Sequence, residues 1–231
     1  MIMKNIIKTR STDRDNLLFE FLLRHKFIDS VGGSILFNSS EKVFMERVRK
    51  LKKDRFVQIG YQRTGDKSLC LISLDLSIKK MYGLSHLRIL PIENYFEGSQ
   101  LKHAVAVRKI CAILTQLDVE YLVHNEFTKD ENLKCELIPD VYVASSQTGY
   151  EIQISRKPQD MYNKKLYALQ NSKDVIKKLI YLTPFSENIR EKINAADEFK
   201  KDRFTNIMIF TDTKNKVQIL DLDEYVNNYL I

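Results

Sequence analysis

LIPDVYVASSQTGYEIQISRKP, residues 137–158, is the stretch of this 231-residue chain that decides the fold of its second part. Two runs of alternating apolar residues flank a polar segment with Gly149, which predicts a β-hairpin. Asp140 opens the first run, and the second run carries Glu151 and Gln153. Acidic and amide side chains on neighbouring strands fit three interpretations: a metal site that cuts DNA, a site that has lost its metal, or a hairpin with one solvated face.

The segments around this hairpin alternate between helical and strand-like periodicity. The expected elements are, in chain order, a helix at 99–117, strands at 119–127, 139–145 and 150–155, a helix at 160–182 broken near 171–172, a helix at 188–201, strands at 206–212 and 216–222, and a closing helix at 223–231. The order helix–strand–strand–strand–helix–strand is that of the restriction-endonuclease-like core. We therefore expect an α/β (α+β) chain whose second part is a mixed-sheet domain of this kind.

In that core an Asp begins the second strand, and an acidic residue and a Lys follow on the third. Asp140 and Glu151 match the acidic positions, where carboxylates on adjacent strands converge on Mg²⁺ or Mn²⁺. Period-2 alternation puts Gln153 on the face of Glu151, where Lys is usual, and we expect its amide to orient water. Glu126, at the end of the preceding strand, would assist as a further carboxylate. The missing positive charge could come from Lys157, Lys164 or Lys165.

The composition is that of a folded protein with a sizeable core, with 44% hydrophobic and 29% charged residues. No window approaches 18 uncharged apolar residues, and the N-terminus lacks the apolar segment of a signal peptide, so we expect no membrane span. Three widely spaced cysteines have no zinc-ligand spacing and suit reduced thiols. These features predict a cytoplasmic protein.

The basic excess of the chain lies entirely in its first third. Residues 1–80 contain 17 Lys and Arg against 9 Asp and Glu, whereas residues 81–231 contain 20 against 21. A nucleic-acid contact should therefore begin in the first third, because phosphates attract such an excess. A Lys-rich surface that is merely solvated would spread its charge more evenly.

The first third has the pattern of a winged helix-turn-helix. A helix capped near 11–12 is followed by a short helix in DSVGGSILF, 29–37, and by a helix in NSSEKVFMERVRKLKKD, 38–54. The third helix places Val43, Phe44, Val48 and Leu51 on one face. Two alternating runs then flank TGDK, 64–67, which is a strong hairpin signal.

In such a domain the third helix enters the major groove and the hairpin touches the backbone or the minor groove. We expect contacts to double-stranded DNA from Lys42, Arg49 and Lys50 on the helix and from Arg63 and Lys67 on the hairpin. Arg47 lies closer to the buried face. The alternative is a solvated helical domain that binds a protein, since winged helices also serve as dimerisation modules.

These patterns divide the chain into a winged-helix domain at 1–82, a connector at 83–98 and a nuclease-like domain at 99–231. The sequence also resembles the replication-relaxation family of bacterial plasmids and integrative elements. The segments that carry the resemblance are TDRDNLLFEFLLRHKFIDS, MERVRKLKKDRFVQ, LKHAVAVRKI, HNEF, IPDVYVAS, YEIQIS and NKKLYAL. The strand EIQIS also looks like that of CoiA-type competence nucleases, in which Gln153 would be an accepted variant.

The resemblance implies a winged helix followed by a PD-(D/E)xK-type, nuclease-like domain, and action in the replication or DNA processing of a mobile genetic element. It carries the acidic positions to Glu126, Asp140 and Glu151, and a Lys/Tyr pair to Lys165 and Tyr167.

Two functions remain open: metal-dependent DNA nicking, or a non-catalytic DNA-binding accessory or transcriptional regulator whose second domain mediates assembly. A protein adaptor that does not bind DNA is a third. The candidate protein partners are replication or conjugation proteins and a second copy of the chain.

Overall fold

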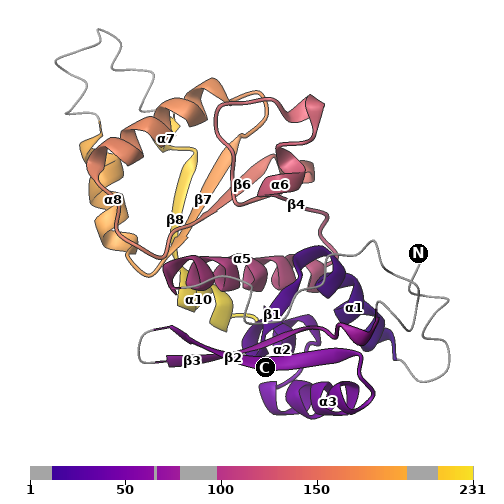
Figure 1. The fold of residues 1–231 in the computed structure, drawn as a ribbon. Coiled ribbons are helices and arrows are strands. Elements are labelled where there is room, and N and C mark those ends of the chain that lie inside the picture. The colour runs from indigo at the N-terminus through magenta and orange to yellow at the C-terminus, as the bar shows by residue number, and fades with distance from the viewer. Residues whose placement is uncertain (1–11, 65–66, 79–97, 197–212, 231) are drawn as a thin grey trace, which may run out of the picture. The chain divides into compact units, whose positions relative to one another are not determined.

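The computed structural model describes residues 12–64, 67–78, 98–196 and 213–230. The chain is a mixed α/β protein that divides into two compact units, Met1–Asp118 with Tyr229–Ile231, and Val119–Asn228 (Figure 1). The first unit combines helices with a three-stranded antiparallel sheet, and the second combines helices with a five-stranded mixed sheet. The predicted α/β class is confirmed at this level. The predicted connector at 83–98, except Gly98, and the predicted strand at 206–212 lie outside the described residues.

The first unit begins with three helices and a short strand. Its elements are α1 (Asp13–His25), β1 (Phe27–Asp29), α2 (Ser30–Leu36), α3 (Glu41–Lys53), β2 (Val57–Thr64), β3 (Lys67–Leu74) and α5 (Gly98–Gln116). The sheet order is β1-β3-β2, with β3 antiparallel to both neighbours. The three helices and the hairpin therefore form where the periodicity predicts them.

Side-chain caps set where α1 and α3 begin. The Asp15 N–H donates to Oγ1 of Thr12 and the Thr12 N–H donates to the Asp15 carboxylate, which is a reciprocal capping box. At α3 the Val43 N–H donates to Oγ of Ser40. Both helix starts fall where the sequence predicted caps.

The Phe44 side chain of α3 packs directly against Gly33 of α2. A Cβ atom on Gly33 would lie 2.0 Å from Cζ of Phe44, a side chain with no exposed surface. Any larger residue would therefore force the Phe44 ring out of its site. This contact fixes how α3 is rotated about its axis relative to α2.

Helix α5 packs with the first unit. Its Leu101, Ala104 and Val105 contact Phe27 and Leu71 of the small sheet. Lys109 pairs with the α2 cap residue Asp29 at 3.3 Å, and the Arg108 guanidinium lies 3.9 Å from the Phe27 ring centroid. The sequence assigned this helix to the second domain as the first element of a nuclease-like core, whereas the structure places it in the first unit, with Leu101, Ala104 and Val105 packed on the N-terminal sheet.

The second unit contains a sheet of order β4-β5-β6-β7-β8. Its elements are β4 (Leu122–Val123), α6 (His124–Phe127), the 3-10 turns Glu131–Leu133 and Ala144–Ser146, β5 (Val141–Val143), β6 (Thr148–Ile152), α7 (Gln159–Asn171), β7 (Lys178–Thr183), α8 (Ser186–Ala195), β8 (Val217–Asp221) and α10 (Leu222–Asn227). The first three strands run antiparallel, and β6, β7 and β8 are parallel.

The hairpin predicted in 137–158 is confirmed as β5 and β6, with Val141 opposite Tyr150. Two neighbouring predictions were wrong in part. The helix expected over 160–182 ends at Asn171, which confirms the break expected near 171–172, but β7 (Lys178–Thr183) takes the place of its last residues, because a short apolar run cannot be assigned by periodicity alone. The strand expected over 119–127 ends at Val123, and Glu126 lies in the short helix α6.

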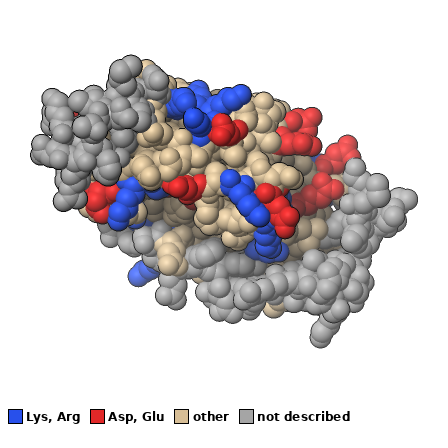
Figure 2. Space-filling model, turned by 90° about the horizontal axis from the view of Figure 1, so that it is seen from above, with Lys and Arg blue, Asp and Glu red and all other residues tan. Residues whose placement is uncertain are grey.

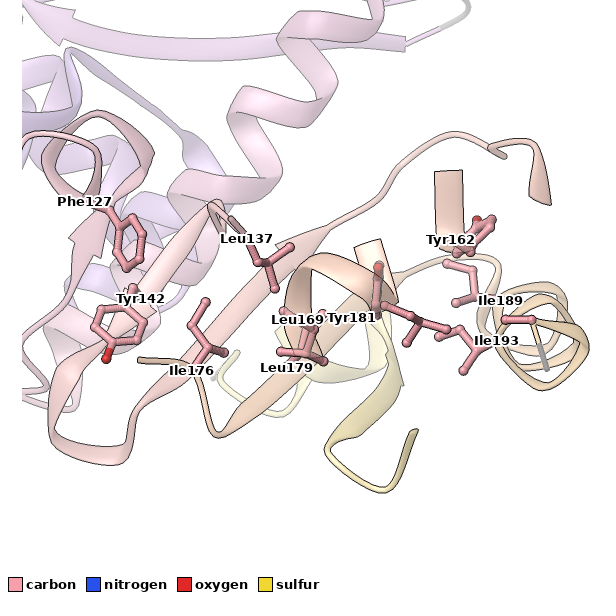
Figure 3. Packing of buried hydrophobic residues seen from close by; sticks show 12 residues of the cluster. Phe127, Leu137, Tyr142, Tyr162, Leu169, Ile176, Leu179, Tyr181, Ile189 and Ile193 are labelled. Atoms are coloured by element: carbon pink, nitrogen blue, oxygen red, sulfur yellow. The ribbon is translucent and has the colours of Figure 1, made fainter. Parts of the chain in front are cut away.

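The main core of the second unit lies between the sheet and the helices α7 and α8 (Figure 3). Its buried members are Phe127, Leu137, Tyr142, Tyr162, Leu166, Leu169, Ile176, Leu179, Tyr181, Ile189, Ile193 and Ala196. The Tyr142 hydroxyl donates to the Val175 carbonyl at 2.8 Å, which satisfies its polar end. Within the described ranges, none of the helices combines the length and apolar character that a membrane crossing requires.

We expect Gly33→Ala to lower the free energy of unfolding by about 1–3 kcal/mol or more, since the methyl group overpacks the contact with Phe44. Urea denaturation followed by circular dichroism measures the change. Gly149→Ala is a graded control, because its Cβ would meet Pro139 Cβ at 3.2 Å and should cost less. A Gly33→Ala protein as stable as the wild type would contradict the close approach.

Candidate nucleic-acid interface and candidate carboxylate site

Helix α3 has one buried and one exposed face. Phe44, Val48 and Leu51 are buried at positions i, i+4 and i+7. The exposed residues are Glu41, Lys42, Val43, Glu46, Arg49, Lys50, Lys52 and Lys53. The three predicted DNA-binding residues of this helix are thus all exposed. Val43 was expected on the buried face but is 48% exposed, because it lies beside the stripe that Phe44 and Val48 define.

Arg47 is held within the protein by Asp15 of α1. Its Nε atom donates to Oδ1 of Asp15 at 2.8 Å, and the guanidinium also contacts Oδ2. Burial acts to raise the pKa of Asp15, but the hydrogen bonds from Arg47 and Thr12 and the guanidinium charge hold it below its ordinary value. Arg47 therefore joins α3 to α1, as its position near the buried face indicated.

The hairpin adds an exposed aromatic residue and a cation next to α3. Tyr61 is 70% exposed and lies opposite Cys70, and Arg63 is exposed opposite Ser68. Burial raises the pKa of the Cys70 thiol, and the charges of Glu41 and Arg49 act on it as well. Tyr61 and Arg63 are two residues apart on β2, so their side chains lie on the same face of the hairpin. Lys67 begins β3, but its side chain lies outside the described residues.

The two units differ in net charge. Residues 1–118 contain 21 Lys and Arg against 12 Asp and Glu, and residues 119–228 contain 16 against 18. In the view of Figure 2, Lys and Arg of the described residues lie among Asp and Glu and form no continuous positive surface on that face. The cations of α3 and the hairpin are thus the polyanion-binding candidates, because they belong to the unit with the excess.

In the second unit, strand pairing brings the predicted carboxylates together. Asp140 immediately precedes β5, and since Val141 pairs with Tyr150, Asp140 is the neighbour of Glu151. Oδ2 of Asp140 accepts from the Ile152 N–H at 2.8 Å. Glu151 lies opposite Tyr181 of the parallel strand β7. Asp140, Glu151 and Tyr181 therefore form a row across three strands.

Lys165 of α7 forms an ion pair with the Glu151 carboxylate, and the side chains are 28% and 12% exposed. Its Nζ atom also lies 6.0 Å from the Tyr181 ring centroid. Burial raises the pKa of Tyr181 well above its ordinary value, and the charges of Glu151 and Asp140 raise it further. We name the set Asp140, Glu151, Lys165 and Tyr181 the carboxylate site.

Of the three lysines considered from the sequence, Lys165 is the one that pairs with Glu151. Lys164 lies 3.6 Å from Asp160 on the outer side of α7, and Lys157 is exposed in the loop before that helix. Tyr167, which the family resemblance singled out, is 49% exposed. Among the described lysines, Lys165 therefore supplies the positive charge at this site.

Gln153 turns into the protein interior. It is 6% exposed, and its amide Nε2 donates to the Tyr162 hydroxyl and to the Ser155 carbonyl, the latter at 3.0 Å. This amide fixes the loop that connects β6 to α7. These contacts give the Gln153 amide nitrogen a structural role.

Glu126 takes part in a helix cap. Its Oε2 accepts from the Val123 N–H at 3.0 Å, at the start of α6. Within the part of the chain that the structure describes, no group of three or more His, Cys, Asp or Glu side chains is arranged to hold a metal ion.

The sequence did not indicate the tyrosines of this region. Tyr181 lies in a run that reads as helix or strand, and its position beside Glu151 depends on the parallel pairing of β6 with β7. Tyr162 shares the apolar face of α7 with Leu166 and Leu169, which hid its contact with Gln153. The strand order reveals the position of Tyr181, and the packing of α7 on the sheet reveals that of Tyr162.

Comparisons with models of protein families, with curated proteins and with solved structures find no match for this chain. The resemblance to the replication-relaxation family therefore remains a prediction from the sequence motifs.

We expect Arg47→Met to lower the free energy of unfolding at pH 7 by about 2–3 kcal/mol, because it leaves the Asp15 carboxylate buried and unpaired. The lowered pKa of Asp15 means that the pair adds stability above roughly pH 4 and loses it as the pH falls through the folded-state value. The difference from the wild type should therefore shrink in acid.

Urea denaturation at pH 7 and pH 3 tests this expectation. The matched control is Arg49→Met, the exposed neighbour on the same helix, which should change stability by less than about 0.5 kcal/mol. Equal effects of the two substitutions would show that the Asp15–Arg47 pair is not needed to hold α3.

Proposed function

We propose that this protein binds double-stranded DNA through α3 and the β2–β3 hairpin, and acts in plasmid replication or DNA processing of a bacterial mobile genetic element. The order α1-β1-α2-α3-β2-β3, with β3 between β1 and β2, supports a winged helix-turn-helix in which α3 enters the major groove. The resemblance to the replication-relaxation family supplies the biological setting.

The observation that carries this proposal is the division of α3 into two faces. Phe44, Val48 and Leu51 bury one face, and Lys42, Arg49 and Lys50 are held in water on the other. Arg63 extends the positive charge onto the hairpin. Exposed cations on one helix face and on the following hairpin are the groups that neutralise phosphates when a winged helix binds duplex DNA.

We expect the combined change of Lys42, Arg49 and Lys50 to Gln to weaken binding to duplex DNA and to reduce the slope of log K against log salt by about 3. Fluorescence anisotropy with a labelled duplex over a salt series measures both quantities. The matched control changes the exposed Lys173, Lys177 and Lys178 of the second unit to Gln and should leave the slope unchanged. Identical slopes for wild type and the α3 variant would refute the assignment.

For the second unit we propose a metal-dependent phosphodiester site built on Asp140, Glu151 and Lys165. Mg²⁺ is usually held by one or two protein carboxylates, with water and substrate phosphate completing the shell, and the neighbouring carboxylates of Asp140 and Glu151 supply two. Asp140 and Glu151 would hold Mg²⁺ or Mn²⁺, and the bound ion would act as a Lewis acid toward the phosphate. Lys165 balances the charge of Glu151 and keeps an ammonium group beside it.

The rival proposal is a non-catalytic DNA-binding accessory or transcriptional regulator. Its support is that Lys165 already neutralises Glu151 and that the Gln153 amide is bound to Tyr162. Glu126, the third predicted carboxylate, caps α6. In this proposal the same polar cluster only attaches α7 to the sheet, and the second unit serves assembly.

A plasmid-nicking assay separates the two proposals. If the site is catalytic, supercoiled plasmid is nicked with Mn²⁺ or Mg²⁺, Asp140→Asn and Glu151→Gln abolish nicking, and Lys165→Gln lowers the rate about 10²-fold. Asp140→Asn keeps an acceptor for the Ile152 N–H, so the hairpin is preserved. Asp160→Asn, on the exposed side of α7, is the control that should remain active.

Wild-type protein that binds the plasmid but does not nick it, together with unchanged melting temperature on addition of Mn²⁺, would reject the catalytic proposal and favour the accessory. Nicking that persists in Asp140→Asn would identify a contaminating nuclease. Circular dichroism of each variant checks that the fold is retained.

A further inference from the structure

The exposed side of α3 is not uniformly basic along its length. The first two turns expose Glu41, Lys42, Val43 and Glu46, with a net charge of −1. The last two turns expose Arg49, Lys50, Lys52 and Lys53, with a net charge of +4. A helix that only bound phosphates would be expected to carry cations along its whole exposed side, because each carboxylate there repels the DNA backbone.

The helix dipole accounts for Glu41 but not for Glu46. Glu41 is the first residue of α3, where a negative charge is favoured, whereas Glu46 lies in the second turn. Lys42 and Lys50 are four residues before and after it, yet within the described residues Glu46 forms no ion pair with either. Its carboxylate is exposed in the middle of the stripe of cations.

Val43 is the second exposed residue of α3 that a surface for binding only the DNA phosphates would not need. It is 48% exposed, one helical turn before Glu46. An apolar side chain gains nothing from phosphate, but in the major groove it can pack on the methyl group of thymine. A glutamate in the same groove accepts a hydrogen bond from the N4 amine of cytosine. Recognition helices commonly place their first residues against the base edges.

We infer that this protein reads a specific duplex sequence, with Glu46 accepting from a cytosine N4 amine and Val43 packing against a thymine methyl. Arg49 and Lys50 hold the backbone and set the position of the helix. This inference rests on the proposed DNA binding and extends it from the class of ligand to the choice of sequence. It names Glu46 and Val43 as residues that determine specificity.

Selection from a pool of randomised duplexes tests the inference on the full chain. The wild type should enrich a defined site that contains a C·G pair. Glu46→Gln should lose discrimination at that pair by about tenfold in anisotropy measurements and bind a scrambled duplex as well as before or better. Val43→Ala should lose preference at a T·A pair. Glu20→Gln makes the same charge change on the exposed side of α1 and should select the wild-type site.

Sequence-specific recognition and DNA binding as such can fail separately in these experiments. A wild type that binds duplexes with strong salt dependence but enriches no sequence would overturn the inference and leave the DNA-binding proposal standing. A Glu46→Gln protein that selects the same site with the same discrimination would also overturn it. A wild type that binds no duplex at all would overturn both the inference and the DNA-binding proposal.

Discussion

The contact of Phe44 with Gly33 is the constraint on which the exposed surface of α3 depends. Because the ring lies where a Cβ atom of residue 33 would be, a glycine at this position lets α3 pack with Phe44 directly against α2. The resulting rotation of α3 buries Val48 and Leu51 and turns Lys42, Arg49 and Lys50 to solvent. The ion pair between Arg47 and the buried Asp15 holds the same rotation from the side of α1, at the cost of removing one cation from the basic surface.

In the second unit, too, an ion pair stabilises the fold and uses a cation that could otherwise meet a ligand. Glu151 lies beside Asp140 and the buried Tyr181, and its side chain is 12% exposed, so placing this carboxylate there is costly unless a partner meets it. Lys165 meets it and thereby attaches α7 to β6. The same pair serves a nuclease, which needs a cation near phosphate, and an accessory protein, which needs only a stable sheet–helix contact.

Local patterns predicted the elements whose signals lie within a few residues. The caps at Thr12 and Ser40, the basic helix α3 and the β5–β6 hairpin could all be predicted. The failures lie where the pattern is short or ambiguous. The β7 run read as a continuation of α7, Glu126 was expected on a strand, and Val43 was assigned to the buried face although it lies just beside it. The placement of α5 failed for another reason, since an amphipathic helix does not show which sheet it covers.

The amino-acid sequence by itself determined the periodicities, the helix caps, the basic excess of the first unit and the presence of Asp140 and Glu151 on consecutive strands. Only the tertiary structure decided which side chains meet. Parallel pairing of β6 with β7 brings Tyr181 beside Glu151, and α7 delivers Lys165 rather than Lys157 or Lys164 to that carboxylate. The physical reason is that such contacts depend on strand order and helix rotation, which are set by the packing of residues far apart in the chain.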